Sequence, residues 1–275
     1  MKIAYTINGL IGGFVGRNSQ TSDKSNDSVI ILEYVSNLLY KNIIQPNNAD
    51  VFIFSWHTNF ENQFKENLNP KRMKLEKQID FTIPDHLKSG NTDRVKGHMS
   101  RWYGVKEVIN LVWEYENENN FEYDLVVNAR FDICWNRKYD LFNLNPNNFH
   151  IPIHWDKPHW GWPLQNPEIS DHIFATNSNW MKHYATLYDK IDEYTLPGQC
   201  PQWNTISNHF LMVWHLRKLG LLSEDIVKKT FKVLHHSSKD IVGGSKDPNI
   251  DYDLFRFRKF TKDEVIELND KTNNI

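Results

Sequence analysis

Short apolar runs alternate along the chain with stretches of helical spacing. Runs of mostly apolar residues bounded by polar or glycine-rich turns predict buried strands at residues 2–7, 49–56, 123–132, 149–153 and 171–176. Segments in which apolar residues recur every three or four positions predict helices at residues 28–41, 105–115, 179–194 and 202–219. Residues 59–97 are polar and weakly periodic, so helix pieces and an adaptable loop are expected there. This alternation predicts an α/β fold with a mostly parallel sheet flanked by helices.

Length and composition fit one folded domain over residues 1–275. The 275 residues can bury a substantial core, since 40% of them are hydrophobic and 24% are charged. The formal net charge of -2, without a long basic run, argues against a large electrostatic contact with nucleic acid or an anionic membrane. The two cysteines, Cys134 and Cys200, lie far apart and match no zinc spacing, which favours a reducing compartment.

The sequence carries no recognisable secretion signal. It opens on an apolar, strand-like run without a basic region and a cleavage site before it. No window reaches the roughly 18 uninterrupted apolar residues that a membrane-spanning helix needs. These features predict a protein of the cytoplasm, which for a viral protein would be that of the host.

The predicted strand 123–132 is apolar until its carboxyl end, where Arg130 and Asp132 stand. A carboxylate at a strand end can hold Mg²⁺ or Mn²⁺, and such a cation neutralises the pyrophosphate that leaves a sugar nucleotide. Arg130 can pair with phosphate or support the aspartate through bidentate hydrogen bonds. The alternative is an ion pair between these two side chains that only caps the strand.

A glycine-rich turn follows the first predicted strand. Glycine lets backbone N–H groups approach a nucleotide closely, so we predict nucleotide contacts by Thr6, Asn8, Gly9 and Arg17. The glycine spacing matches neither a dinucleotide-binding fingerprint nor a phosphate-binding P-loop. A surface turn without a ligand is therefore the competing interpretation.

Aromatic side chains are concentrated in the loop 154–166. Its first part, residues 154–162, contains three tryptophans and two histidines. Such rings can stack on a sugar or a base, which predicts a platform for the donor sugar or the acceptor. The alternative is an aromatic mini-core that anchors a long loop.

Two further polar residues are candidates for chemistry. Asp171 follows the aromatic loop and can orient acceptor hydroxyls or act as a general base, although aspartate at such a position also serves as a cap or turn residue. His236 follows an apolar, strand-like run and can ligate a metal, although exposed or core-capping histidines are commoner than ligands.

Three stretches together resemble a loose group of microbial and viral glycosyltransferases of the GT-A type. They are residues 100–106 (SRWYGVK), 121–132 (FEYDLVVNARFD) and 170–174 (SDHIF). In that group a serine-aromatic helix precedes a YDxVxxxRxD strand, and an isDxxf strand comes later. The resemblance implies a glycosyltransferase with a nucleotide-sugar donor, assisted by a divalent cation, Mn²⁺ or Mg²⁺.

By this resemblance, residues 130–132 stand where GT-A enzymes carry their DxD metal motif. Asp132 matches the final carboxylate and is the implied ligand of metal and nucleotide, whereas Arg130 replaces the first carboxylate. One carboxylate binds a cation less tightly than two, so this departure weakens the expected metal site. Arg130 and Asp171 are the implied catalytic residues, and Arg101 is expected to reach a phosphate across the cleft.

The same interpretation places the sugar nucleotide on residues 1–135 and the acceptor on residues 136–275, which include the C-terminal helices. A glycan, a lipid-linked sugar, a protein and modified DNA are all open as acceptors. Two other functions fit parts of the pattern. One is a sugar-phosphate nucleotidyltransferase with the same fold and metal chemistry, and the other is a carbohydrate-binding module that uses the tryptophan-rich loop without catalysis.

Overall fold

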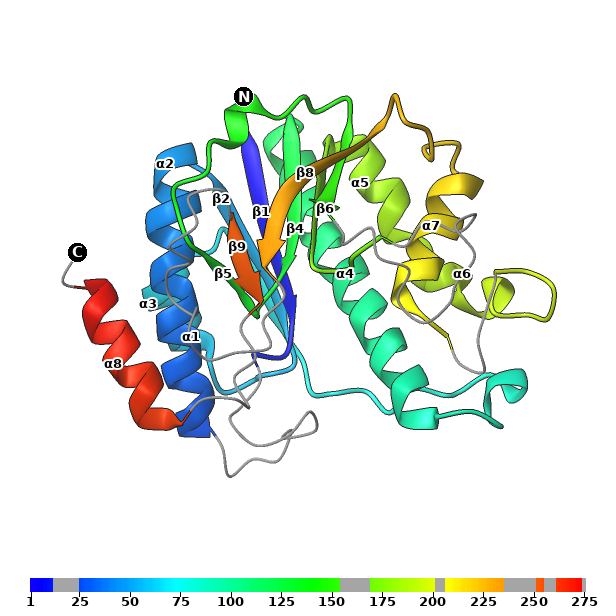
Figure 1. The fold of residues 1–275 in the computed structure, drawn as a ribbon, viewed down its shortest axis with the longest axis horizontal. Coiled ribbons are helices and arrows are strands. Elements are labelled where there is room, and N and C mark those ends of the chain that lie inside the picture. The colour runs from blue at the N-terminus through cyan, green and yellow to red at the C-terminus, as the bar shows by residue number, and fades with distance from the viewer. Residues whose placement is uncertain (12–24, 154–168, 201–205, 235–250, 255–260, 274–275) are drawn as a thin grey trace.

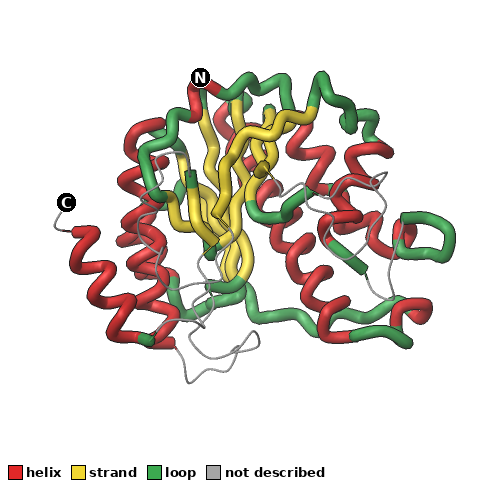
Figure 2. Tube along the Cα trace, in the orientation of Figure 1, coloured by secondary structure: helices red, strands yellow, loops and turns green. Residues whose placement is uncertain are grey.

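A mixed β-sheet lies at the centre of the structure, a computed structural model that describes residues 1–11, 25–153, 169–200, 206–234, 251–254 and 261–273. Within these residues, the strands pair in the order β3-β2-β1-β4-β7-β6-β8-β9-β5. Helices stand on both sides of the sheet (Figures 1 and 2). The strands are β1 (Ile3–Gly9), β2 (Asp50–Ser55), β3 (Arg72–Leu75), β4 (Leu125–Arg130), β5 (Ile133–Trp135), β6 (Phe149–Ile153), β7 (Ile173–Thr176), β8 (Val227–Leu234) and β9 (Tyr252–Leu254).

Most strand pairings are parallel. β1 pairs in parallel with both β2 and β4, and β2 pairs in parallel with β3. Two more parallel pairings join β6 to β8 and β8 to β9, whereas β4–β7, β6–β7 and β5–β9 are antiparallel. The predicted α/β fold with a mostly parallel sheet flanked by helices is confirmed.

Two helical layers cover the sheet (Figure 1). One layer holds α1 (Ser25–Leu39), α3 (Glu61–Leu68) and α8 (Lys262–Asn273), with α1 continued by a π-helical turn (Tyr40–Ile44) and α2 (Gln45–Asn47). The other holds α4 (Thr92–Asn119), α5 (Ser178–Ala185), α6 (Leu187–Tyr194) and α7 (Asn208–Lys218). Short 3-10 turns occur at Asp85–Leu87 and Leu141–Asn143. Among the described residues, no helix is both long and apolar enough to cross a membrane.

The alternation of side chains along β1 separates two cores. Successive residues of a strand point to opposite faces of the sheet. Tyr5 and Ile7 therefore join the buried cluster beneath α1, whereas Ala4 joins the cluster beneath α4. The same period places Thr6 and Asn8 on the α4 face, and both are buried there.

The neighbouring strand β4 adds two polar side chains to this face. In the parallel register Asn128 pairs with Thr6 and Arg130 pairs with Asn8. We call these four residues the polar row. α4 crosses close to it at Gly104, where an added Cβ would lie 3.3 Å from Cδ1 of Phe54 and 3.5 Å from both the Cβ and the Oδ1 of Asn8.

The structure extends the predicted helix 105–115 in both directions. α4 has 28 residues and begins after Asn91, whose side chain accepts a hydrogen bond from the backbone N–H of Arg94 at 3.0 Å. Such a cap satisfies one of the N–H groups that a helix start leaves without a partner. The cap lies within the polar stretch 59–97, which also contains α3 and β3. Periodicity alone missed this start because the first turns of α4 are largely polar.

Two other predicted boundaries also change. The predicted helix 179–194 is divided into α5 and α6 at Thr186, whose hydroxyl donates to the carbonyl of His183 at 2.7 Å. A side chain that bonds to the backbone in this way competes with helical hydrogen bonds. The predicted strand 171–176 begins at Ile173, so Asp171 precedes β7.

Candidate functional site

The carboxyl ends of β1 and β4 meet where the sheet changes its direction of growth. From β1 the chain passes through α1 to β2 on one side, and after α4 it returns to β4 on the other side of β1. In open α/β sheets, ligands bind outside the carboxyl ends of the strands at such a switch point. Asn8 and Arg130 stand there as register partners. The topology therefore marks this edge of the sheet as the candidate ligand site.

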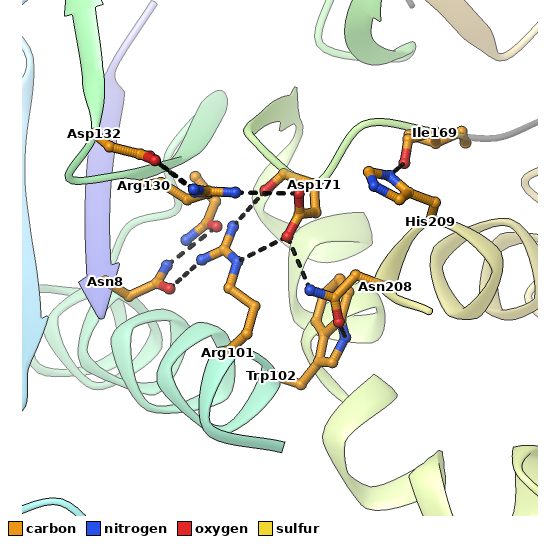
Figure 3. A network of polar contacts seen from close by, with 10 residues as sticks. Asn8, Arg101, Trp102, Arg130, Asp132, Ile169, Asp171, Asn208 and His209 are labelled. Carbon is orange, nitrogen blue, oxygen red and sulfur yellow. Dashed lines mark hydrogen bonds and ion pairs between the residues drawn. The ribbon is translucent and has the colours of Figure 1, made fainter. Parts of the chain in front are cut away.

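Arg130 lies in the middle of a network of charged side chains (Figure 3). Its Nε donates to Oδ1 of Asp132 at 2.8 Å, and its Nη2 donates to Oδ2 of the same carboxylate. Its Nη1 donates to Oδ1 of Asp171 at 3.3 Å. Burial acts to lower the pKa of Arg130, but the two carboxylates raise that pKa above its ordinary value overall. The guanidinium is thus a fixed positive charge held by two carboxylates.

Arg101 enters the network from α4. Its Nη1 donates to Oδ1 of Asn8, and its Nη2 donates to the backbone carbonyl of Asp171 at 2.9 Å. Its Nε lies 3.9 Å from Oδ2 of Asp171 and has no hydrogen-bond partner within the described residues. Burial lowers the pKa of Arg101 to about 10, while Asp171 acts to raise it. Arg101 is therefore charged at neutral pH and links the end of β1 to the residues before β7.

Asp171 connects these arginines to α7. Its Oδ2 accepts a hydrogen bond from Nδ2 of Asn208 at 2.9 Å, and its side chain is only 9% exposed. Burial acts to raise the pKa of Asp171, but Arg130, with smaller effects of nearby histidines and Arg101, holds it well below the ordinary value. A carboxylate with so low a pKa is a weak base. This environment weighs against a general-base role for Asp171, and its other predicted role, orienting acceptor hydroxyls, stays a prediction.

Thr6, a predicted nucleotide contact, is fully buried within the sheet. Its hydroxyl donates to the carbonyl of Val127 at 3.1 Å and accepts from Nδ2 of Asn128 at 2.8 Å. Asn128 in turn accepts at Oδ1 from Nδ2 of Asn8 at 3.2 Å. The inner part of the polar row is satisfied by its own hydrogen bonds, as buried polar groups require.

Asn8 and Gly9, two predicted nucleotide contacts, lie at the carboxyl end of β1, where each is hydrogen-bonded to a neighbouring residue. The side chain of Asn8 is 2% exposed and positions Arg101. Gly9 has a φ of 107°, a conformation that glycine tolerates, and its carbonyl accepts from Oγ of Ser55 at 3.0 Å, which ties the end of β1 to β2. Arg17, His236 and the aromatic loop 154–166 lie outside the described residues.

The donor set around Asp132 does not fit a divalent cation. Both oxygens of Asp132 are bonded to Arg130. The other carboxylate of the network, Asp171, faces Arg130, Arg101 and Asn208. Mg²⁺ takes about six oxygen ligands, with carboxylates that point at the metal. In the described part of the chain, no group of three or more His, Cys, Asp or Glu residues is arranged to hold a metal.

Three residues of the network were not predicted from the sequence. Nε1 of Trp102 donates to Oδ1 of Asn208 at 3.0 Å, and this bond orients the amide toward Asp171. His209 is bonded through Nδ1 to the backbone carbonyl of Ile169 at 2.7 Å. Asn208 and His209 begin α7, where a polar pair precedes an apolar helical run. That pair is the only sequence signal for them, since no spacing relates the start of α7 to residues 130 or 171.

Comparisons with known proteins add little to this geometry. A comparison with protein-family models found no match to the sequence, and a comparison with curated proteins found no significant match. Among solved structures, the chain is similar to one from Desulfovibrio desulfuricans G20 that is described as a "putative nucleotide-diphospho-sugar transferase". The two share 11% sequence identity with a TM-score of 0.46, over 99% of this chain and 96% of the other. Similarity at this level carries no functional argument, so the function rests on the site.

Proposed function

We propose that this protein is a glycosyltransferase that binds the diphosphate of a nucleotide sugar at the carboxyl edge of β1 and β4. The observation that carries the proposal is the pair of arginines, Arg101 and Arg130, brought together at the switch point of the sheet. Guanidinium groups recognise phosphate through directed, charge-assisted hydrogen bonds. The resemblance of residues 121–132 to a GT-A strand supports the same ligand class.

Arg130 is the residue best placed to touch the ligand. Its side chain is 25% exposed, whereas those of Arg101 and Asp171 are 10% and 9% exposed. A guanidinium has five N–H donors. The bonds to Asp132 and Asp171 use three of them within the described residues, which leaves two donors for phosphate oxygens.

The arrangement supports departure of the leaving group. In sugar transfer, the bond between the anomeric carbon and the diphosphate oxygen breaks, and the electron pair goes to the diphosphate. An acceptor oxygen forms the new bond to the anomeric carbon, and its proton passes to solvent water. Fixed donors aimed at the charge that develops on the diphosphate stabilise the transition state more than the ground state. Arg130 has this role in the proposal, Arg101 adds a second donor to the diphosphate, and Asp171 and Asn8 are positioning residues around the two arginines.

A thermal-shift screen of UDP, GDP and dTDP sugars tests the proposal, with CMP sugars, which carry a single phosphate, as the comparison. A ligand at a hundred times its dissociation constant stabilises the folded state by about 2.7 kcal/mol. For a chain of this size each kcal/mol raises the melting temperature by about 2–4 °C. We expect one nucleotide class to raise it by several degrees and to release its nucleoside diphosphate when acceptors are supplied.

Matched arginine variants locate the binding site. Arg130→Lys should lose most of the thermal shift, whereas Arg72→Lys should keep it. Arg72 is a suitable control because it is 27% exposed and is paired with Glu118 and Glu114 on α4, away from the polar row. If no nucleotide sugar shifts the melting temperature, the proposal fails. Stabilisation by free glycans without any nucleotide would instead support the carbohydrate-binding alternative.

A further inference from the structure

Asp132 and Asp171, the carboxylates that would hold a metal cation, are already paired with the positively charged side chain of Arg130. Asp132 gives both of its oxygens to Arg130, and Asp171 gives Oδ1 to the same guanidinium. In a metal-dependent sugar transferase, carboxylates coordinate a divalent ion that in turn binds the diphosphate. Here the position between two carboxylates is filled by the side chain that replaces the first carboxylate of the expected motif.

The geometry points to Arg130 as the resident cation of this site, which takes the diphosphate directly and without a divalent metal. The inference rests on the proposed function, because it assumes that a nucleoside diphosphate is the ligand. Asp132 and Asp171 then serve as positioning residues that hold the guanidinium in place and leave two of its N–H donors for the phosphate oxygens.

The charges and the burial of these side chains favour Arg130 as the cation of the site over a metal ion that displaces Arg130 from Asp132. A metal at Asp132 would have to share two oxygens that already accept hydrogen bonds from Arg130, and the guanidinium would lie beside the incoming ion. Like charges at such close range repel strongly in a partly buried site. Arg101 adds a second fixed positive charge, which lies within 3.9 Å of Asp171. Two arginines around two carboxylates make the site neutral before any metal arrives.

Arg101 also has an unused donor. Its side chain is 10% exposed, and its Nε makes no hydrogen bond within the described residues. A buried N–H group without a hydrogen bond is costly, so such groups often mark a place where a ligand or water binds. A phosphate oxygen that accepts hydrogen bonds from both arginines would satisfy this donor together with those of Arg130.

Titration calorimetry with free nucleoside diphosphates tests the inference. Each of UDP, GDP, CDP and dTDP is titrated into the full chain, once with excess EDTA and once with excess manganese chloride. The dissociation constant of the bound nucleotide should be the same in both solutions. Arg130→Lys should weaken binding by about tenfold or more in both, because lysine keeps the charge but loses the directed, charge-assisted hydrogen bonds.

Asp132→Asn separates the two accounts by the solution in which its effect appears. If Arg130 is the cation, asparagine holds the guanidinium less firmly, and binding should weaken by the same factor in EDTA and in manganese. If Asp132 is a metal ligand, the variant should weaken binding in manganese alone, and the dependence on manganese should disappear. Melting curves of each variant without ligand establish that it folds. Should Arg130→Lys fail to fold, the EDTA titration and Asp132→Asn still decide the question.

The outcomes also separate this inference from the proposed function. Binding that is absent in EDTA, restored by manganese and lost in Asp132→Asn would overturn the role of Arg130 while the glycosyltransferase proposal stands. Failure of all four nucleoside diphosphates to bind in either solution would remove the proposed function and the inference with it.

Discussion

The two faces of β1 and β4 use alternate residues of the same strands for different purposes. On the face beneath α1, Tyr5 and Ile7 pack in an apolar cluster, and the hydroxyl of Tyr5 accepts a hydrogen bond from Nε1 of Trp135 at 3.0 Å. On the face beneath α4, the polar row leads from the buried Thr6 out to Arg130 at the strand end. One face thus contributes mainly to stability, and the other positions charged groups at the sheet edge.

The largest effect on the α4 face should follow the loss of Asp171. Asp171→Ala leaves Arg130 and Arg101 without their shared carboxylate, and breaking a buried ion pair in this way costs about 3–5 kcal/mol. The free energy of unfolding, measured in urea, should fall by that amount. Glu118→Ala is the control, because its exposed pair with Arg72 should contribute at most about 1 kcal/mol. Equal losses in the two variants would contradict the central place of Asp171.

Two neighbouring residues of β1 should separate stability from binding. Ile7→Ala removes buried methyl groups from the α1 face and should lower the free energy of unfolding by about 3 kcal/mol. Asn8→Ala releases Arg101 and should weaken nucleotide binding by more than Ile7→Ala does. Calorimetry at a temperature where both variants are folded measures the difference. Similar affinities in the two variants would mean that the faces do not differ in function.

A third difference between the two faces is the close approach of α4 to Asn8 at Gly104. Gly104→Leu places a side chain against Asn8 and should cost about 2 kcal/mol through overpacking. It should also weaken nucleotide binding, because α4 carries Arg101. Gly97→Leu lies in the same helix, and a Cβ there meets no atom within 4 Å, so this control should be neutral or slightly stabilising. A control that loses as much stability as Gly104→Leu would exclude the packing explanation.

The smallest predicted effect is a loss of stability at acidic pH. The pKa of Asp171 in the folded state lies well below its ordinary value. Its contribution to stability is therefore complete above the unfolded pKa, about 3.9, and is lost as the pH falls through the folded pKa. Urea unfolding at decreasing pH should show a loss below about pH 4 that Asp171→Asn lacks in part. Identical profiles for the two proteins would remove the coupling to Arg130.

The sequence predicted the frame of the molecule better than its site. The apolar runs located the central strands because burial on both faces requires such runs. They missed the first turns of α4 and the break at Thr186, since caps and side-chain bonds to the backbone set those boundaries. Arg130 and Asp132 stood out because they end an apolar strand. The pairing of both Asp132 oxygens with Arg130 could not be predicted from the sequence, because it depends on the positions of the two side chains in space.

Residues distant along the chain are harder to predict. Asn208 reaches Asp171 from the start of α7, where Nε1 of Trp102 on α4 orients its amide. The burial of Thr6 likewise follows from the hydrogen bonds that its register partner Asn128 makes in β4. A single sequence contains no periodicity that records contacts of this kind.

The most direct test of the account is a crystal structure of the chain with the nucleoside diphosphate selected in the thermal-shift screen. The diphosphate should lie at the carboxyl edge of β1 and β4, with phosphate oxygens about 2.7–2.9 Å from nitrogen atoms of the Arg130 guanidinium. A nucleotide bound elsewhere, or a diphosphate that reaches Asp132 through a metal ion after Arg130 has turned away, would contradict it.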